Sequence, residues 1–206
     1  MEISKVLSIA FISLMGAMSP GPDFAIVVKN CLRGKFRDGF WTTVGVSSAI
    51  LIHVTYCLLG VAWIIYESQF LFHLIKYAGA AYLFYLGVMM LREKISDENV
   101  ADIAKTAPTK KQSPFLIGFL TNLLNPKATL FILSLFTQFI DPQMNFWEKA
   151  FLGSEIAVIG FLWFTLLSYL ITHRYLQKHF ARFHRIITKT MGVVLCLLAL
   201  YVAIFS

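Results

Sequence analysis

Charged residues are scarce in this sequence of 206 residues: they make up 14% of the chain, against roughly 25% in an average soluble domain. Hydrophobic residues account for 58%, compared with roughly 45–50% in such domains. This composition is typical of an integral membrane protein. The longest polar stretch, residues 92–113, is too short to form a soluble catalytic domain and is predicted to be a linker.

Cysteine is also rare, and no metal or redox motif is present in the sequence. The three cysteines, Cys31, Cys57 and Cys196, show neither a CxxC motif nor the His/Cys spacing of a zinc site. We therefore expect no disulfide framework, no metal site and no cofactor. The net charge of +7 does not indicate nucleic acid as a partner, because the basic residues lie in short segments between apolar runs.

Six apolar stretches are long enough to cross a lipid bilayer as helices. About 20 residues at ~1.5 Å rise per residue span the ~30 Å hydrocarbon core, and helices satisfy their own backbone hydrogen bonds in lipid. The chain is therefore predicted to be an all-α, multi-pass protein with the lipid bilayer as its surroundings. The predicted spans cover residues 5–28, 41–65, 70–91, 115–138, 149–171 and 187–205.

Basic residues alternate between the connections that join these spans. Lys and Arg number four after the first span, none after the second, five after the third, one after the fourth and five after the fifth. Connections rich in Lys and Arg face the cytoplasm. The alternation predicts a cytoplasmic linker at about residues 92–113 and both termini outside the membrane.

Proline interrupts the first and fourth spans at corresponding places. The first span contains Ser19-Pro20-Gly21-Pro22-Asp23, and the fourth contains Asn122, followed by Asn125-Pro126-Lys127. Two units of three spans are implied, at about residues 1–91 and 114–206 of a single transmembrane domain, 1–206. Because three is odd, the second unit enters from the opposite side of the membrane. Corresponding broken helices in inverted repeats indicate the binding site of a transporter.

Each break is predicted to expose the N-terminus of a half-helix near the membrane midplane. Ser19 is expected to cap a half-helix that begins at Pro20, and Asn125 one that begins at Pro126. Two such ends would attract an anionic group, such as a substrate carboxylate. The candidate substrate site is the set Ser19, Pro20, Gly21, Pro22, Asp23, Asn122, Asn125, Pro126 and Lys127.

Ionisable residues within the spans are candidates for ion coupling, because a charge at the bilayer centre costs about 2.5–3.5 kcal/mol or more. Asp23, Lys127 and Glu155 lie well inside the spans. Asp23 and Lys127 are expected to neutralise one another, as a structural pair or as part of the transport site. Glu155 is a candidate for ion coupling, and its alternative is a position at the outer mouth of the protein. His53 is a candidate proton carrier, and its alternative is a histidine that serves only packing or hydrogen bonding.

At these residues the chain resembles the LysE/RhtB family of small bacterial amino-acid exporters over its full length. The motifs concerned are Ser19-Pro20-Gly21-Pro22-Asp23, Gly39-Phe40, Gly79-Ala80-Ala81-Tyr82-Leu83 and Asn125-Pro126-Lys127. The resemblance implies export of an amino acid or related small solute across the bacterial inner membrane, driven by an ion gradient without ATP. It does not fix the substrate, because members handle basic, neutral or sulfur-containing amino acids and distant relatives handle metal ions.

Three other functions are alternatives to amino-acid export. An intramembrane enzyme would need a catalytic constellation, and the sequence contains neither HExxH nor GxSxG. A divalent metal-ion carrier would need metal ligands, and the conceivable ones, such as Cys57, His53 and Glu155, are scattered over different spans. A membrane scaffold that transports nothing would give no reason for charged residues beside the paired helix breaks. Small-residue spacing such as Gly45 to Ala49 suits packing within one subunit as well as in a homodimer.

Overall fold

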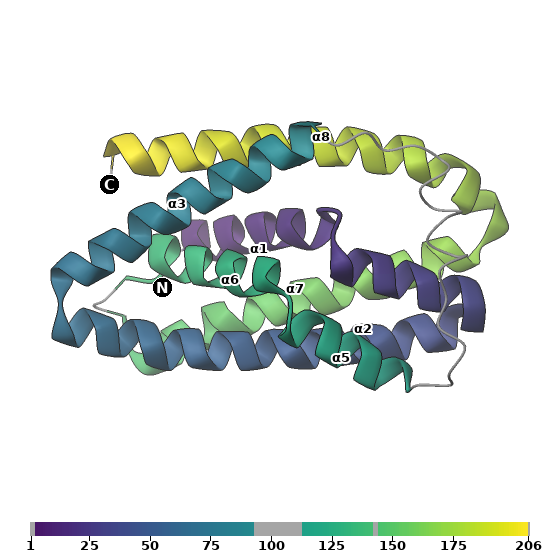
Figure 1. Ribbon diagram of the computed structural model, residues 1–206, viewed down its shortest axis with the longest axis horizontal. Helices are drawn as coiled ribbons and strands as arrows, with labels where there is room; N and C mark the ends of the chain where they lie inside the picture. Colours follow the sequence, from purple (N-terminus) through teal and green to yellow (C-terminus); the bar gives the residue numbers. More distant parts are fainter. Residues whose placement is uncertain (1–2, 93–112, 142–143, 206) are drawn as a thin grey trace.

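The computed structural model describes residues 3–92, 113–141 and 144–205, and the regular elements in this part of the chain are helices (Figure 1). The linker predicted between the two units lies almost wholly outside the described residues. The helices are α1 (Ile3–Met18), α2 (Pro22–Glu67), α3 (Gln69–Arg92), α5 (Pro114–Leu123), α6 (Pro126–Phe139), α7 (Phe146–Thr172) and α8 (Arg174–Phe205).

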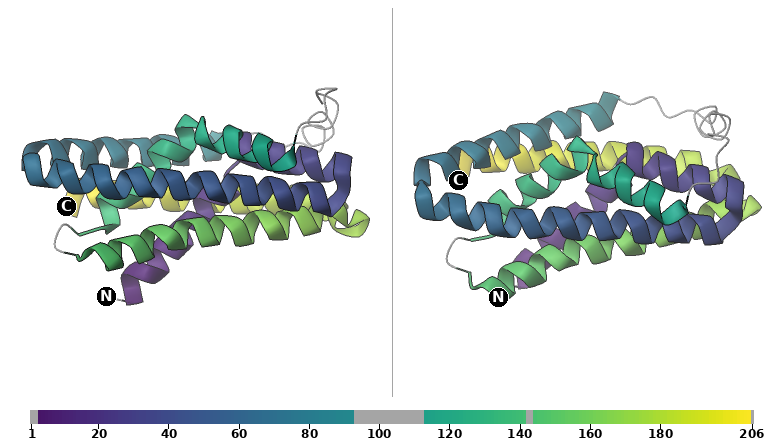
Figure 2. Two further views of the ribbon diagram at one scale, coloured as in Figure 1. Left: turned by 90° about the horizontal axis from the view of Figure 1, so that it is seen from below. Right: turned by 60° about the horizontal axis from the view of Figure 1, so that its bottom comes forward.

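The helices run along one long axis as an elongated bundle (Figures 1 and 2). Helix α2 packs against α5 and α7, and α3 packs against α8 and α6. The shorter helices α1 and α6 lie in the middle of the bundle in Figure 1. Both ends of the chain lie toward the same end of the bundle as the α2–α3 connection, whereas the α7–α8 connection lies at the opposite end.

Helix length and composition identify a membrane protein among the described residues. Three helical segments are long and apolar enough to cross a membrane alone, and two bent pairs raise the number to five. The bend is 62° between Ile3–Met18 and Pro22–Arg33, and 60° between Pro114–Leu123 and Pro126–Phe139. The sixth predicted span coincides with a shorter apolar helix, Thr188–Ile204, within α8.

The connection expected between the first two spans, at about residues 29–40, is helical rather than a loop. Helix continues on both sides of Lys35, which alone departs from helical geometry, with φ 63° and ψ −165°. A positive φ is uncommon for a residue other than glycine. It produces a kink at Lys35, and the residues on either side of the kink stay helical. The helical segments on either side of Lys35 therefore extend beyond the predicted spans.

Glycines bring neighbouring helices into backbone contact. A Cβ atom added to Gly118 in α5 would lie 2.2 Å from the carbonyl oxygen of Thr42 in α2. Gly87 of α3 and Gly192 of α8 face one another, and a Cβ on either would lie 2.8 Å from the carbonyl oxygen of the other. Gly45 likewise packs against α5 of the same chain. Small residues thus set the helix spacing, as is common in membrane bundles.

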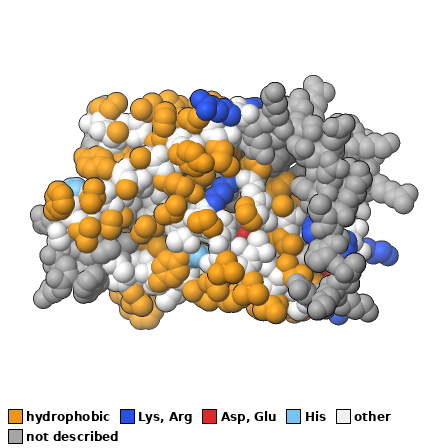
Figure 3. Space-filling view, viewed as in Figure 1, with side chains coloured by type: hydrophobic (Ala, Val, Ile, Leu, Met, Phe, Trp, Pro, Cys, Tyr) orange, Lys and Arg blue, Asp and Glu red, His pale blue; other side chains and the backbone are white. Residues whose placement is uncertain are grey.

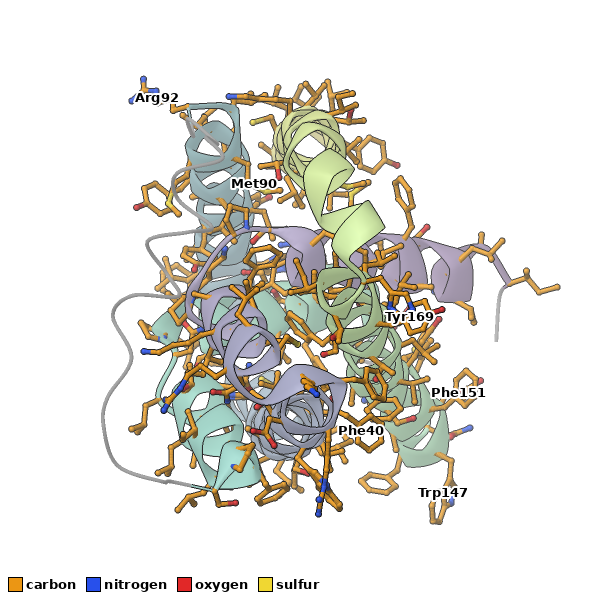
Figure 4. The ribbon with its side chains drawn as sticks, turned by 90° about the vertical axis from the view of Figure 1, so that its right-hand side faces the viewer. Phe40, Met90, Arg92, Trp147, Phe151 and Tyr169 are labelled. Carbon is orange, nitrogen blue, oxygen red and sulfur yellow. The ribbon has the colours of Figure 1, made fainter. Side chains whose placement is uncertain are left out.

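The outside of the bundle is apolar along most of its length. In Figure 3, hydrophobic side chains are spread over the whole described face, whereas Lys, Arg, Asp and Glu atoms form a few small spots near its middle, at its upper edge and at its right-hand side. Helix α7 shows the pattern clearly: Phe151, Val158, Leu162 and Tyr169 are about half exposed. Phe151 points away from the bundle in Figure 4. Such an exposed stripe suits contact with lipid instead of water.

Candidate functional site

The second helix break forms as the sequence predicts. Helix α5 ends at Leu123, α6 begins at Pro126, and the Asn125 side chain caps α6 by accepting a hydrogen bond from the Lys127 backbone N–H at 3.0 Å. Proline at the first helical position gives up only an amide that the helix would leave unpaired. The predicted Asn125 cap is confirmed.

The first break differs from the prediction. Helix α2 begins at Pro22, not at Pro20, and Gly21 precedes it as the cap residue, its carbonyl accepting the N–H of Ala25 at 3.0 Å. The Ser19 backbone N–H bonds back to Met15 at 3.1 Å. The predicted Ser19 cap is therefore wrong, because Ser19 completes the end of α1 instead of starting the next helix.

The side chain of Lys127 crosses from the second break to the first. Its ammonium donates to the hydroxyl of Ser19 and to the backbone carbonyl of Pro20. Gly21 allows this approach: a Cβ at that position would lie 3.2 Å from the Lys127 Nζ atom. The cation at the start of α6 thereby holds the backbone of the opposite break.

Asp23 is held by the second break in turn. Its Oδ2 atom accepts hydrogen bonds from the side-chain amides of Asn122 at 3.0 Å and Asn125 at 2.9 Å. Asp23 also lies in the first turn of its half-helix, where the helix dipole favours a negative charge. Lys127 lies in the first turn of α6, where the dipole opposes its charge, so its carbonyl and hydroxyl partners compensate for that position.

A cavity of about 60 Å³ lies between the two breaks. This volume holds only a few water molecules, so the site is compact in this conformation. Three polar atoms of lining residues are buried without a hydrogen-bond partner among the described residues: Oδ1 of Asp23, Oδ1 of Asn122 and Oγ of Ser13. The residues that line it are Ser13, Gly16, Ala17, Ser19, Gly21, Asp23, Phe24, Ile50, Asn122, Asn125, Lys127, Ala128, Phe131, Ile132, Ile156, Gly160 and Phe164.

The nine predicted site residues come together at this cavity in two roles. Six of them are in the lining, whereas Pro20, Pro22 and Pro126 shape the backbone: Pro22 and Pro126 begin the half-helices, and Pro20 offers its carbonyl to Lys127. The structure thus assembles residues that lie about one hundred positions apart in the sequence. The lining residues of each break are Ser19, Gly21 and Asp23 in the first, and Asn122, Asn125 and Lys127 in the second.

His53 is not among the residues that line the cavity. It is 1% exposed, and its Nε2 atom lies 3.1 Å from the backbone oxygen of Asn122. Because a carbonyl oxygen only accepts, Nε2 carries the hydrogen. Its Nδ1 atom contacts the hydroxyl of Tyr56, which lies 3.3 Å from the hydroxyl of Thr129. His53 therefore supports the end of α5.

Glu155 of α7 is also outside the lining, although the next residue, Ile156, is part of it. Its Oε2 atom is buried and has no hydrogen-bond partner among the described residues. The roles predicted for Glu155 and His53 in ion coupling stay predictions.

The apolar walls of the cavity were not predicted from the sequence. Ile156, Gly160 and Phe164 come from α7, and Gly16 and Phe131 from α1 and α6. Their spacing along α7, at i, i+4 and i+8, is that of one helix face. In an almost uniformly apolar span this pattern does not distinguish a cavity wall from a packing face, so no sequence signal singled these residues out.

Comparisons with known proteins give a consistent result. The model of the LysE type translocator family matches residues 14–206. The chain is 32% identical to the membrane protein YrhP of Bacillus subtilis, over 89% of this chain and 91% of that protein. It is 29% identical to a threonine efflux protein of Escherichia coli, over 85% and 86% of the two chains, and 32% identical to a leucine efflux protein of Salmonella choleraesuis, over 72% and 70%.

No solved structure shows significant similarity to this chain. The matched relatives are bacterial, and together with the apolar helices they identify a multi-pass bacterial membrane protein. Proteins of this kind transport solutes and are not enzymes. The chain belongs to the LysE type translocator family.

Proposed function

We propose that this protein is a secondary active exporter that moves amino acids, or closely related small solutes, out of the cytoplasm. Relatives named as threonine and leucine efflux proteins support the transport of amino acids. The observation that carries the proposal is the cavity between the helix breaks, which contains one carboxylate and one ammonium group, Asp23 and Lys127. An amino acid carries the same two charges.

The substrate's two ionic groups have complementary partners in this cavity. The Oδ1 atoms of Asp23 and Asn122 are acceptors without partners among the described residues, and they suit the substrate's ammonium group. The ammonium of Lys127 and the N-terminal ends of α2 and α6 suit its carboxylate. Substrate binding would displace Lys127 from Ser19 and Pro20, so that binding loosens the contact between the breaks.

The proposal includes six spans arranged as two inverted repeats within one domain, residues 1–206. The two bent pairs support it because they break by nearly the same angle, 62° and 60°. The packing supports it as well: α1 packs on α7, and its counterpart α5 packs on α2. The apolar end of α8, Thr188–Ile204, is proposed as the sixth span.

Coupling to a proton or another cation is proposed to act at Asp23. A proton or cation at Asp23 would compete with the substrate's ammonium for the same carboxylate, which links the two fluxes. The position of Asp23 in the cavity supports this role. Glu155 and His53 are further candidates and lie outside the lining.

Efflux from proteoliposomes tests the proposed function. Vesicles that contain the purified protein are loaded with a mixture of radiolabelled amino acids and diluted into buffers with and without an imposed pH gradient. We expect saturable efflux that responds to the gradient and that free amino acids inhibit, whereas amino-acid amides, which lack the carboxylate, do not. Saturable cadmium or nickel flux without amino-acid flux would instead support a metal-ion carrier.

We also propose that both termini face outward, as the alternation of basic residues predicts. Single cysteines introduced by Phe146→Cys, at the start of α7, and by Ser113→Cys, before α5, test this orientation in a cysteine-free background. Both positions are exposed. An impermeant thiol reagent added to intact cells should label the Phe146→Cys variant alone, and labelling of the Ser113→Cys variant alone would reverse the topology.

A further inference from the structure

The cavity between the helix breaks has two chemically different parts. Its polar part consists of the residues at the two breaks, including both of its charged groups, Asp23 and Lys127. Its apolar part is formed largely by α6 and α7, where Phe131, Ile156 and Phe164 are at most 8% exposed. This division matches the chemistry of a molecule with an ionic end and an uncharged end.

We propose that the apolar part is the compartment for the substrate's side chain, that it accepts uncharged side chains, and that Gly160 sets their size. This inference rests on the proposed function, since it assumes that the ionic groups of an amino acid occupy the two breaks. Residues of α7 then discriminate between substrates. Those residues belong to a helix that carries neither break.

Charge is the first criterion of selection. In the described lining, Asp23 and Lys127 are the charged residues, and both are assigned to the ionic groups that every amino acid shares. A lysine or glutamate side chain in the apolar compartment would lie beside Phe131, Ile156 and Phe164 without an opposite charge. Burying an unpaired charge is costly, so charged side chains are rejected.

Size is the second criterion, and two of the three glycines in the lining, Gly16 and Gly160, differ in this respect. A Cβ at Gly16 would lie 2.2 Å from the ring of Phe131, so Gly16 allows α1 and α6 to pack. A Cβ at Gly160 would meet only the Ile50 Cδ1 atom, at 3.1 Å. A methyl group at Gly160 would therefore require only the end of the Ile50 side chain to shift slightly, and it would take up space in the cavity lining.

Filling or enlarging this space should change selectivity in opposite directions. One methylene in an apolar pocket changes discrimination by about 10- to 200-fold. The variant Gly160→Ala should thus lower leucine efflux relative to alanine efflux by about tenfold or more. The variant Ile156→Ala enlarges the same compartment and should raise the ratio of leucine to alanine efflux.

The control is Gly60→Ala, which makes the same substitution in α2, a helix that packs on α7. A Cβ at Gly60 meets no atom within 4 Å, and Gly60 is not part of the lining. Gly60→Ala should leave the leucine-to-alanine ratio unchanged, so that any shift in Gly160→Ala is specific to the compartment.

The measurement is the efflux of alanine, valine, leucine, lysine and glutamate from proteoliposomes with equal amounts of each variant. Opposite shifts in Gly160→Ala and Ile156→Ala, with lysine and glutamate retained in all vesicles, support the proposal. An unchanged ratio in Ile156→Ala, or lysine or glutamate efflux as fast as that of alanine, overturns it while leaving the proposed function intact. If none of the five amino acids moves, the proposed function fails as well.

Discussion

The two helix breaks occupy corresponding places in the chain, but they are not chemically equivalent. The second break is capped by its own side chain, because Asn125 accepts the backbone N–H of Lys127 at 3.0 Å. The first break has glycine at the cap position, and its neighbouring groups are held by residues of the second: Lys127 donates to Ser19, and Asn125 donates to Asp23. Groups at the first break are therefore held by side chains of the second, whereas the second break supplies its own helix cap.

The two breaks also contribute opposite charges to the cavity. An acidic residue follows the first break and a basic residue follows the second, so the negative and positive groups come from different halves of the chain. A strictly symmetric pair of breaks would present the same charge twice. If the two units are the inverted repeats proposed above, divergence between them gives the site one acidic and one basic side, which suits the proposed amino-acid substrate.

Removing either charge should have the largest effect on transport. We expect Asp23→Asn and Lys127→Gln each to lower the initial efflux rate by about a hundredfold, because a lone charge near the bilayer centre costs about 2.5–3.5 kcal/mol and the substrate loses one ionic partner. Efflux from proteoliposomes checks this, with membrane abundance measured for each variant. The control Lys5→Gln removes a basic residue that is not part of this cavity. Wild-type efflux in either neutral variant would remove that charge from the mechanism.

Exchanging the two charges tests whether the breaks are interchangeable. The double variant Asp23→Lys with Lys127→Asp should recover membrane abundance relative to the single variants, because the opposite charges are retained. Efflux should stay at least about tenfold below wild type, since the carboxylate then faces the carbonyl of Pro20, which cannot donate. Full recovery of efflux would show that mutual neutralisation is all that the pair provides.

Removing one side chain from each break should lower the thermal stability of the protein by different amounts. Asn125→Ala loses a cap, worth about 1 kcal/mol, and a hydrogen bond to a carboxylate, worth about 1.5–3 kcal/mol. Ser19→Ala loses one partner of Lys127, which keeps the carbonyl of Pro20. Thermal unfolding in detergent should therefore give a larger fall in midpoint for Asn125→Ala. Equal losses in the two variants would contradict the asymmetry.

His53 should have the smallest effect on transport, because it supports the second break without lining the cavity. His53→Gln keeps an N–H donor for the backbone oxygen of Asn122, so we expect efflux within a fewfold of wild type. His53→Ala removes that donor and should lower stability by about 1 kcal/mol or more. If His53→Gln abolished the response to a pH gradient at normal abundance, His53 would be a proton carrier and not a support.

The second break was predictable from the sequence because its geometry is local. Asn125 caps a helix only two residues away, and Pro126 fits the first helical position. The first break was located correctly but its helix start was not. Pro20 and Pro22 both suit a helix start, and the sequence does not rank them. In the folded chain, the Pro20 carbonyl instead accepts from Lys127, which lies 107 positions away.

The sequence by itself determined the class of protein, the position of the two breaks and the residues near them. Uniformly apolar runs of about 20 residues form helices in lipid, and proline and asparagine act on their immediate neighbours. The tertiary structure alone decided that the Asn122 and Asn125 amides bind Asp23, and that Ile156, Gly160 and Phe164 face the same cavity. The reason is that helices in a membrane associate through close packing of their surfaces, and uniformly apolar sequences do not reveal which faces will meet.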